Sequence, residues 1–309
     1  MSGALVLGEL CLDIIVYNQQ GVAVLGEPAW AEDIVLRLGG SATYAAQALR
    51  ALGLEVALCG VAGEDATTEH GLARLSEEGI SVEGVRRQAR QPMPRCIGVC
   101  EGGQKRFVAC TPLLRHDPKD LTYPLEGIAL LYFGGYLLYP ELWDGSLARL
   151  FEKAKAHHIL VAVDTQLLPI SPHLFKDKAL TPGTMRYVDV LFVNRKEALA
   201  LTGRKQPVEA AENLATLGPR VVVVKTGSEG CLTWSHGECI SSGPLDVEAH
   251  DPIGAGDYFG AAFACGLLQG WNLRRVSDFA NAFAALCISR EKGKGLPSTA
   301  ETLALLEGS

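Results

Sequence analysis

Residues 251–269, DPIGAGDYFGAAFACGLLQ, place a glycine-rich turn directly before an apolar helix predicted over Tyr258–Gln269, which Gly270 closes. The N–H groups of a helix's first turn have no partner within the helix, and the helix dipole adds partial positive charge there. Because Gly254–Gly256 leaves these N–H groups open, the segment predicts an anion-binding hole.

Asp257 stands at the entrance of this predicted helix. One interpretation is that its carboxylate caps the helix. A cap does not require Gly-x-Gly before it, however, and a carboxylate next to an anion hole is what general-base phosphoryl transfer requires. The base takes the hydroxyl proton while the N–H groups stabilise charge on the transferring group. We therefore favour a catalytic role over a capping role.

Other phosphate-binding motifs do not explain this segment. The P-loop pattern G-x-x-x-x-G-K-[ST] occurs nowhere in the chain. The glycines at 254, 256 and 260 lie late in the chain, whereas a dinucleotide fingerprint follows the first strand. A nicotinamide-dependent dehydrogenase is therefore disfavoured.

The rest of the chain alternates short apolar runs with Ala- and Leu-rich helical stretches. Such runs suit strands buried on both faces of a parallel sheet. We therefore expect one α/β domain over residues 1–309, with a doubly wound, mainly parallel sheet and helices on both faces. The expected strands are Ala4–Leu7, Val56–Gly60, Ile128–Phe133, Ile159–Val163, Val188–Val193 and Val221–Val224; the other expected helices are Ser41–Leu52, Gly145–His157, Glu197–Leu201 and Val208–Leu217.

Residues of about 11–37 and 93–111 interrupt this alternation with β-like sequence. The second segment contains a hairpin signal, in which residues 101–104 join RCIGVC to KRFVAC. We expect the two segments to form a small β lid over the substrate site. Because both faces of its strands carry apolar or small groups, a second copy of the chain is expected to cover the outer face in a homodimer. The alternative is a monomer with a mobile flap.

Small, polar or cationic residues follow four of the predicted strands. They are Gly134-Gly135, Asp164, Asn194 and Lys225-Thr226-Gly227. Each alone fits an ordinary turn, but ligands of open α/β sheets bind beyond the carboxyl ends of the strands. The four together favour a binding edge.

A second glycine motif, Gly39-Gly40-Ser41-Ala42-Thr43, begins the helix that Gly53 closes. Two glycines before a helix capped by Ser41 allow a ligand to approach the backbone, and small side chains such as Thr43 leave room for it. A loop-to-helix junction packed with alanines is the competing interpretation.

Composition narrows the function classes. A net charge of −7 argues against non-specific nucleic-acid binding, although backbone N–H groups still suffice for a nucleotide. Nine scattered cysteines without a C-x-x-C pair indicate buried thiols in a reducing cytoplasm. No apolar run reaches 18 residues, so no membrane span is expected, and the N-terminus predicts a strand, not a signal peptide.

These motifs resemble the PfkB, or ribokinase-like, family of carbohydrate kinases. The glycine pair that opens a helix ending in Leu52-Gly53 resembles the first family signature, and DPIGAGDYFGAAF resembles the second, D-T-x-G-A-G-D-x-F. GELCLD, ending in Asp13, is similar to the family's first strand, NRKE at 194–197 to its N-x-x-E motif, and KTGSEG at 225–230 to its nucleotide loop. The resemblance covers almost the whole chain.

The resemblance implies an ATP-dependent, Mg²⁺-requiring kinase that phosphorylates a hydroxyl of a small sugar, nucleoside or polyol. The residues that these motifs supply are Asp257 as the base; the backbone of Gly254, Ala255 and Gly256 as the anion hole; Asp13, Gly39, Gly40 and Thr43 at the substrate; Asn194, Lys225, Thr226, Gly227, Gly230 and Asn281 at the nucleotide; Glu197 near Mg²⁺ through water; and Asp251 near a monovalent cation such as K⁺.

Structural interpretations of several of these residues stay open. Glu197 fits an ordinary first-turn helix acid, Lys225 a solvated strand end, Asn281 a satisfied polar group on an Ala-rich helix, and Asp13 a strand-end charge.

The sequence also departs from the family pattern. Tyr44 stands where many members carry a substrate-binding Asn, so the sugar pocket is expected to differ from that of a typical ribokinase. Pro252 replaces the usual Thr near the cation loop. The stretch from Asp164 to Gln166 does not follow the common D-x-N pattern, so Asp164 receives no role.

An alternative function is a non-catalytic sensor that binds a metabolite or nucleotide on the same fold. Loss of the base or of the anion hole would mark a sensor. Both are intact here, which favours the kinase.

Overall fold

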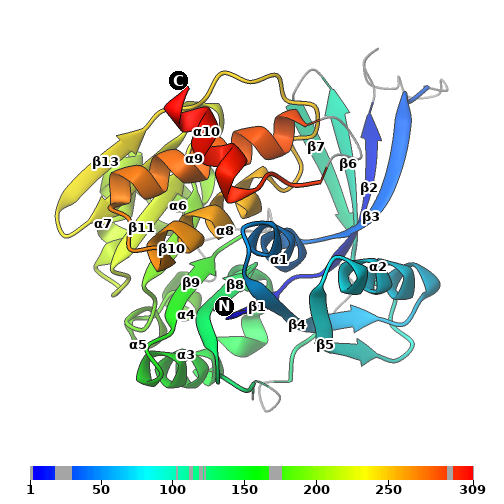
Figure 1. Ribbon diagram of the computed structural model, residues 1–309. Helices are drawn as coiled ribbons and strands as arrows, with labels where there is room; N and C mark the ends of the chain where they lie inside the picture. The colour runs from blue at the N-terminus through cyan, green and yellow to red at the C-terminus, as the bar shows by residue number, and fades with distance from the viewer. Residues whose placement is uncertain are drawn as a thin grey trace.

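The computed structural model describes residues 3–17, 30–101, 104–110, 114–117, 121, 123–166, 176–290 and 295–308. These residues form a large sheet with helices on both faces and a small sheet at one side of it (Figure 1).

The large sheet has the strand order β13-β12-β11-β10-β9-β8-β1-β4-β5. Every pairing from β5 across to β11 is parallel, and β12 and β13 form an antiparallel hairpin at the far edge. The strands are β1 (Gly3–Gly8), β4 (Glu55–Gly63), β5 (Ile80–Gln88), β8 (Ile128–Gly134), β9 (Leu160–Asp164), β10 (Val190–Asn194), β11 (Val221–Lys225), β12 (Cys231–Ser235) and β13 (Glu238–Ser242).

Two apolar cores lie on opposite faces of this sheet. In β1, Ala4 and Val6 pack into one core, while Leu5 and Leu7 pack into the other. Because successive side chains of a strand point to opposite faces, a strand covered on both sides must be apolar throughout. This explains the continuous apolar runs of the sequence.

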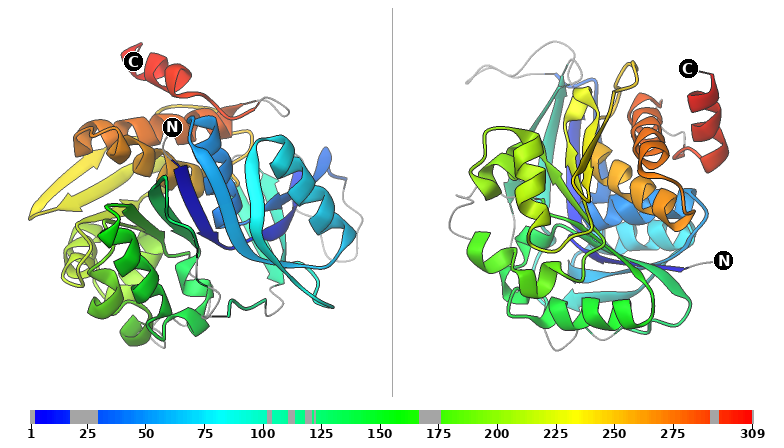
Figure 2. Two further views of the ribbon diagram at one scale, coloured as in Figure 1. Left: turned by 60° about the horizontal axis from the view of Figure 1, so that its bottom comes forward. Right: turned by 90° about the vertical axis from the view of Figure 1, so that its left-hand side faces the viewer.

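Helices supply the outer layers of both cores (Figure 2). The first core is covered by α1 (Ser41–Ala51), α2 (Ala66–Glu77), α8 (Ala255–Leu268), α9 (Leu273–Ser289) and α10 (Thr299–Glu307), and the second by α3 (Ser146–Ala156), α4 (Lys176–Ala179), α5 (Pro182–Met185), α6 (Arg195–Thr202) and α7 (Pro207–Ala215). Short 3₁₀ helices lie at Tyr136–Leu138, Pro140–Leu142 and Gly227–Glu229.

The predicted doubly wound, mainly parallel fold is confirmed, and so are its six central strands. The sequence interpretation missed β5 and the β12–β13 hairpin. β5 and β13 are the outermost strands and have mostly exposed or half-buried positions, and β12, next to β13, alternates buried with half-buried positions. Continuous apolar runs mark strands that are covered on both faces, and the more polar strands near the sheet edges lack such runs.

The small sheet is formed by the two segments that broke the alternation. Its order is β3-β2-β6-β7, with β2 (Cys11–Tyr17), β3 (Asp33–Gly39), β6 (Arg95–Glu101) and β7 (Gln104–Cys110). β6 and β7 form the expected hairpin, and β2 pairs parallel to β6. The parts of the two predicted segments at 18–29, 102–103 and 111 lie outside the described residues.

Two further expectations concern membranes and disulfides. In the part of the chain that the structure describes, no helix combines the length and apolar character needed to cross a bilayer. The eight cysteines with described side chains are free thiols.

Phe192 is the aromatic centre of the first core. It is fully buried in β10 and contacts Tyr132, Phe259 and Phe263. We expect Phe192→Ala to lower the free energy of unfolding by about 3–5 kcal/mol, because truncation leaves a cavity that its ring neighbours cannot fill. Urea unfolding measures the loss. Val208→Ala, at an exposed position of α7, is the control and should change it by less than about 0.5 kcal/mol. Equal effects of the two variants would contradict this account of the core.

Candidate active site

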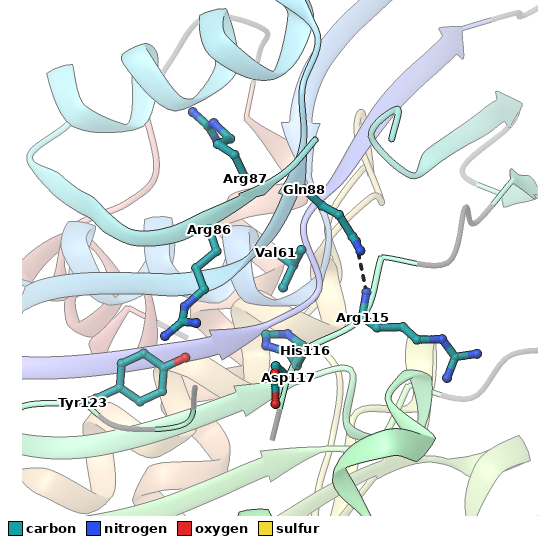
Figure 3. A pocket seen from close by; sticks show the side chains of 8 residues that line it. All are labelled: Val61, Arg86, Arg87, Gln88, Arg115, His116, Asp117 and Tyr123. Carbon is teal, nitrogen blue, oxygen red and sulfur yellow. Dashed lines mark hydrogen bonds between the residues drawn. The ribbon is translucent and has the colours of Figure 1, made fainter. Parts of the chain in front are cut away.

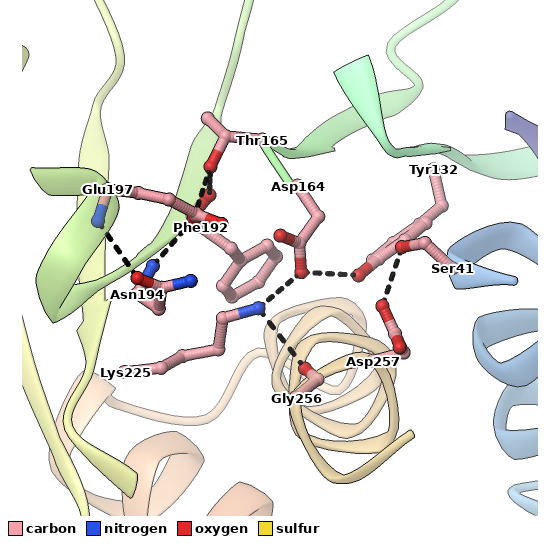
Figure 4. Close-up of polar contacts among 10 residues, drawn as sticks. All are labelled: Ser41, Tyr132, Asp164, Thr165, Phe192, Asn194, Glu197, Lys225, Gly256 and Asp257. Carbon is pink, nitrogen blue, oxygen red and sulfur yellow. Dashed lines mark hydrogen bonds and ion pairs between the residues drawn. The ribbon is translucent and has the colours of Figure 1, made fainter. Parts of the chain in front are cut away.

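The carboxylate of Asp257 lies at the N-terminus of α8, in contact with α1. Helix α8 begins at Ala255, with Gly254 as its N-cap at φ 80°, and no side chain caps it. Oδ1 of Asp257 accepts a hydrogen bond from Oγ of Ser41 at 2.5 Å (Figure 4). Capping, the alternative interpretation of this carboxylate, is therefore wrong: Asp257 is the third helical residue and turns towards α1.

The N–H groups of the first turn of α8 are open in the way the sequence predicts. Those of Asp257 and Tyr258 donate to the carbonyl of Gly254, each at 2.9 Å. No acceptor among the described residues takes the N–H groups of Ala255 and Gly256. Two unpaired donors at a helix N-terminus can bind an anion.

Helix α1 begins in a different way from the prediction. Its N-cap is Gly40, at φ 91°, and Ser41 makes no capping bond because its hydroxyl is used by Asp257. A Cβ at Gly40 would lie 2.5 Å from the carbonyl oxygen of Glu9. The glycine is therefore needed for the close approach of α1 to the end of β1, and the expected Ser41 cap is wrong.

Lys225, at the end of β11, contacts the first turn of α8. Its ammonium donates to Oδ2 of Asp164 at 2.5 Å and to the carbonyl of Gly256 at 3.4 Å (Figure 4). Only 15% of its side chain is exposed, so it is not a solvated strand end. Asp164, to which the sequence interpretation gave no role, is the buried counter-ion of this lysine.

The pKa values of these groups follow from burial and charge. Burial raises the pKa of the Asp257 carboxyl above its ordinary value, although the Lys225 ammonium and the Ser41 hydroxyl oppose the shift. Burial also raises the pKa of Asp164, again against the effect of Lys225. For Lys225, burial lowers the pKa, but the carboxylates of Asp164, Asp257 and Glu197 outweigh it and the net shift is upward.

Asp13 lies within β2, on the inner face of the small sheet, which faces α1. Its Oδ2 accepts a short hydrogen bond from the hydroxyl of Tyr44, which in turn accepts one from Nε of Arg37 at 3.1 Å. A Cβ at Gly39 would lie 2.2 Å from Oδ2, so this glycine makes room for the carboxylate. Asp13 is thus a buried, hydrogen-bonded group, not a strand-end charge.

Two cations of the small sheet contact the loop that precedes α8. Arg37 forms a 2.8 Å ion pair with Asp251, whose Oδ1 accepts the N–H of Ile253 at 3.1 Å. The ammonium of Lys105 donates to the carbonyl of Pro252 at 2.8 Å. The guanidinium of Arg37 therefore occupies the carboxylate that the family resemblance assigned to a monovalent cation.

The predicted N-x-x-E motif forms the start of α6. Asn194 caps the helix and shares a capping box with Glu197. Oε2 of the buried Glu197 accepts the N–H of Asn194 at 2.9 Å and the hydroxyl of Thr165 at 2.7 Å. The first-turn interpretation of Glu197 is correct as far as it goes, and Thr165 additionally joins it to the end of β9.

A separate group of predicted nucleotide residues lies beside β13. Nδ2 of Asn281 donates to Oγ of Ser242 at 2.8 Å and to the carbonyl of Gly243 at 3.1 Å. Gly230 needs its left-handed backbone and lack of a side chain, since a Cβ would lie 2.1 Å from the carbonyl of Ser242. Asn281 is therefore a satisfied polar group, and a nucleotide role for it stays a prediction.

For the remaining predicted nucleotide and substrate residues, the structure gives a position but no contact that tests the predicted role. The N–H of Thr226 donates to the carbonyl of Gly230 at 2.9 Å, which closes the turn around Gly227. Thr43 is buried in the first turn of α1, and its hydroxyl has no hydrogen-bond partner among the described residues.

Sequence reasoning missed Ser41 as a partner of the base, and also Glu9, Arg37, Lys105 and Asp164. Four of them act across elements distant in sequence, so local motifs carry no signal for them. For Lys105 the sequence did carry a signal. Lys105 and Arg106 are successive residues of β7, so only one of the two side chains can lie on the inner face of the small sheet.

A cavity of about 180 Å³ lies near the ends of β4 and β5 and contains none of the predicted site residues. Its lining includes Arg86, Arg87, Arg115 and His116, and the three guanidinium groups point in different directions (Figure 3). A single anion would not be surrounded by them.

Comparisons with known proteins identify the family of the chain. The chain is 26% identical over 318 residues to "Probable fructokinase-4" of Arabidopsis thaliana, covering 97% of this chain and 95% of the relative. It is 27% identical over 286 residues to "ATP-dependent ribose-1-phosphate kinase" of Halopiger xanaduensis, covering 87% and 86%. The structure of Arabidopsis thaliana ribokinase complexed with ribose and ATP superposes with a TM-score of 0.76 at 23% identity, covering 100% of this chain and 99% of that one. The model of the "pfkB family carbohydrate kinase" matches residues 1–299, and the chain therefore belongs to this family of phosphotransferases with hydroxyl acceptors.

Proposed function

We propose that this chain, acting as one domain over residues 1–309, transfers the γ-phosphate of ATP to a hydroxyl of a small sugar, nucleoside or polyol, with Asp257 as the general base. The observation that carries this proposal is the position of the Asp257 carboxylate, beside two unpaired N–H groups at the N-terminus of α8. The family membership and the relatives named as sugar kinases support the substrate class.

The surroundings of Asp257 suit a base that works near neutral pH. Ser41 binds one carboxylate oxygen, which leaves the other for the acceptor hydroxyl. Burial raises the pKa of the carboxyl, while Lys225 and Ser41 oppose this shift. A raised pKa makes a carboxylate a stronger proton acceptor, provided that it stays deprotonated at the working pH.

ATP is proposed to lie along the carboxyl ends of β10 and β11, near Asn194, Lys225, Thr226, Gly227 and Gly230, with Asn281 beyond them. The open N–H groups of Ala255 and Gly256 are then available to the transferring phosphate. Lys225, which bonds to the carbonyl of Gly256, adds positive charge next to this hole.

Mg²⁺ is the expected cofactor, because it neutralises the charge of the phosphates during transfer. Within the described ranges no three acidic, His or Cys side chains converge to hold a metal. Glu197 already accepts hydrogen bonds from Asn194 and Thr165. These residues fit an outer position for Glu197, which would reach the ion through water while the phosphates bind it directly. K⁺ near Asp251 stays a prediction, since Arg37 already supplies a positive charge there.

The acceptor is proposed to lie under the small sheet, near Asp13, Gly39, Gly40 and Thr43. Tyr44 already donates to Asp13, so only part of this carboxylate remains for an acceptor hydroxyl. The acceptor pocket is therefore expected to differ from one in which Asp13 is open. The small sheet would act as the lid that excludes water from the transfer.

The outer face of the small sheet is the proposed homodimer interface. Its register places Ile14 beside Leu36 and Ile97, and Ile97 beside Val108. Leu36 is 55% exposed and Val108 70%. An apolar face of this kind is typical of an interface, and a second copy of the chain offers an identical face to cover it.

We expect Asp257→Asn to lower kcat by about 10²–10⁴-fold, because an amide cannot accept the hydroxyl proton. ATP affinity, measured by calorimetry, should stay near that of the wild type. ADP release across a panel of sugars, nucleosides and polyols is the assay, and Asp246→Asn, at an exposed position, is the control. A variant within a few-fold of the wild type would remove the base assignment, and a wild-type chain that binds a panel member without turnover would indicate a sensor.

Ser41→Ala should move the acid limb of the pH profile of kcat/KM upward by about one to two pH units. The Ser41 hydroxyl lowers the pKa of Asp257, so its loss raises that pKa further. Because the base must be ionised, activity then disappears at a higher pH as the solution is acidified. Ser146→Ala removes a buried serine hydroxyl of α3 and should leave the profile unchanged. Overlapping profiles of wild type and Ser41→Ala would show that this contact does not tune the base.

Light scattering at micromolar concentration should give a mass of about twice 33.0 kDa for the wild type. Leu36→Lys should give a mass near that of one chain, because a lysine would place a charge in the apolar interface. Val208→Lys, on α7 away from this face, is the matched control and should stay dimeric. A wild-type mass near 33.0 kDa would refute the dimer.

A further inference from the structure

Lys105 brings a positive charge from the small sheet to the entrance of the proposed anion hole. It lies on β7, and its ammonium donates to the carbonyl of Pro252 at 2.8 Å. Pro252 stands two residues before Gly254, the N-cap of α8. The ammonium therefore lies close to the helix end at which phosphate is proposed to bind.

The strand register decides which face of the small sheet Lys105 occupies. Lys105 pairs with Cys100, which pairs with Tyr17, and both of these partners are buried. The next residue, Arg106, pairs with Val99 on the opposite, outer face. Lys105 thus lies on the inner face of the small sheet, towards the loop before α8, whereas the adjacent Arg106 lies on the outer face.

The charge of Lys105 is not used by a carboxylate. Lys225 has Asp164 at 2.5 Å, but among the described residues no carboxylate lies within ion-pair distance of the Lys105 ammonium. Its only hydrogen-bond acceptor in the described chain is the neutral carbonyl of Pro252. Because no carboxylate of the described chain pairs with this ammonium directly, its charge remains available to an anion from outside the chain.

Lys105 also remains accessible. The residue is exposed, yet the protein around its ammonium is dense enough that burial lowers its pKa. Asp257 is the neighbouring charge that most opposes this shift, and Lys225 adds to it. An exposed side chain whose ammonium contacts the loop before α8 is open to solvent and close to the N-terminus of α8.

We propose that Lys105 is a catalytic residue that binds an anionic phosphate oxygen between the small sheet and the N-terminus of α8. The proposal rests on the function proposed above. In the transfer, the acceptor oxygen forms its bond to phosphorus, the bond to the bridging oxygen of ADP breaks with its electron pair, and Asp257 takes the hydroxyl proton. Lys105 donates a hydrogen bond to a phosphate oxygen and gives up no proton.

Two sources can supply that oxygen. One is the phosphoryl group that ATP transfers. Lys105, on the small sheet, and Lys225, at the end of β11, would both contact it. The other is a phosphate group carried by the acceptor itself. D-fructose, which is uncharged, and fructose 6-phosphate separate the two sources as probes.

The test compares Lys105→Met, Lys105→Arg and Arg106→Met. Lys105→Met keeps the length of the side chain without its charge, and Arg106→Met makes the matched change on the outer face of the same strand. Turnover is measured with each probe. Binding of orthovanadate in the presence of MgADP is measured by calorimetry, which requires no turnover.

If Lys105 contacts the transferring phosphoryl group, Lys105→Met lowers kcat by about 10²–10³-fold with every acceptor that the wild type uses, and weakens vanadate binding at least tenfold. If it contacts an acceptor phosphate, the loss is confined to a raised KM for fructose 6-phosphate. In both cases Lys105→Arg recovers most of the loss and Arg106→Met resembles the wild type.

Lys105→Met that matches Arg106→Met in turnover and in vanadate affinity overturns the proposal. Failure of the proposed function looks different, because the wild type would then phosphorylate no acceptor at all. In that case vanadate binding still tests contact with the transferring phosphoryl group, and calorimetric binding of fructose 6-phosphate tests contact with an acceptor phosphate. Circular dichroism checks that each variant is folded.

Discussion

The backbone of Glu9 is the junction on which the geometry of the site depends. Its N–H donates to the carbonyl of Gly134 at the end of β8, and its carbonyl accepts the N–H of Ala42 in α1. It also stands between β1 of the large sheet and β2 of the small sheet. One residue thereby sets the position of α1 relative to the parallel strands and the point at which the chain leaves for the small sheet. The contact of α1 with the base in α8 follows from that placement.

The charges around this junction are balanced by partners from separate parts of the fold. Burial raises the pKa of the Glu9 carboxyl to about 7, and the nearby Asp13 and Asp257 carboxylates add to the effect. Cations come from β11 as Lys225 and from the small sheet as Arg37 and Lys105. Because several buried carboxylates cannot remain ionised together without such partners, the small sheet contributes to the electrostatics of the site as well as to its shape.

The sequence was sufficient for what depends on local pattern. Covered strands are apolar throughout, so β1, β8 and β10 were found, and the glycine-rich segment before α8 was recognised as a helix start with open N–H groups. Local pattern was misleading at the helix starts, where Gly40 and Gly254 serve as caps and leave Ser41 and Asp257 to bond with each other. That contact joins residues 216 positions apart, so no local motif contains it. Asp164 was left without a role because its motif departs from the family pattern. Its partner Lys225 comes from another strand, so the local sequence could not show their contact.

The polar character that concealed β5 from the sequence has a consequence of its own. β5 is the outermost strand at one end of a nine-stranded sheet, and no other strand of the described residues pairs with its outer side. Such an edge offers unpaired N–H and C=O groups to any extended chain that approaches it. Along this strand Ser81, Glu83, Arg86 and Arg87 carry polar or charged side chains, and β-structured aggregation requires apolar, weakly charged segments. The composition of β5 therefore keeps the large sheet from growing by the addition of further molecules.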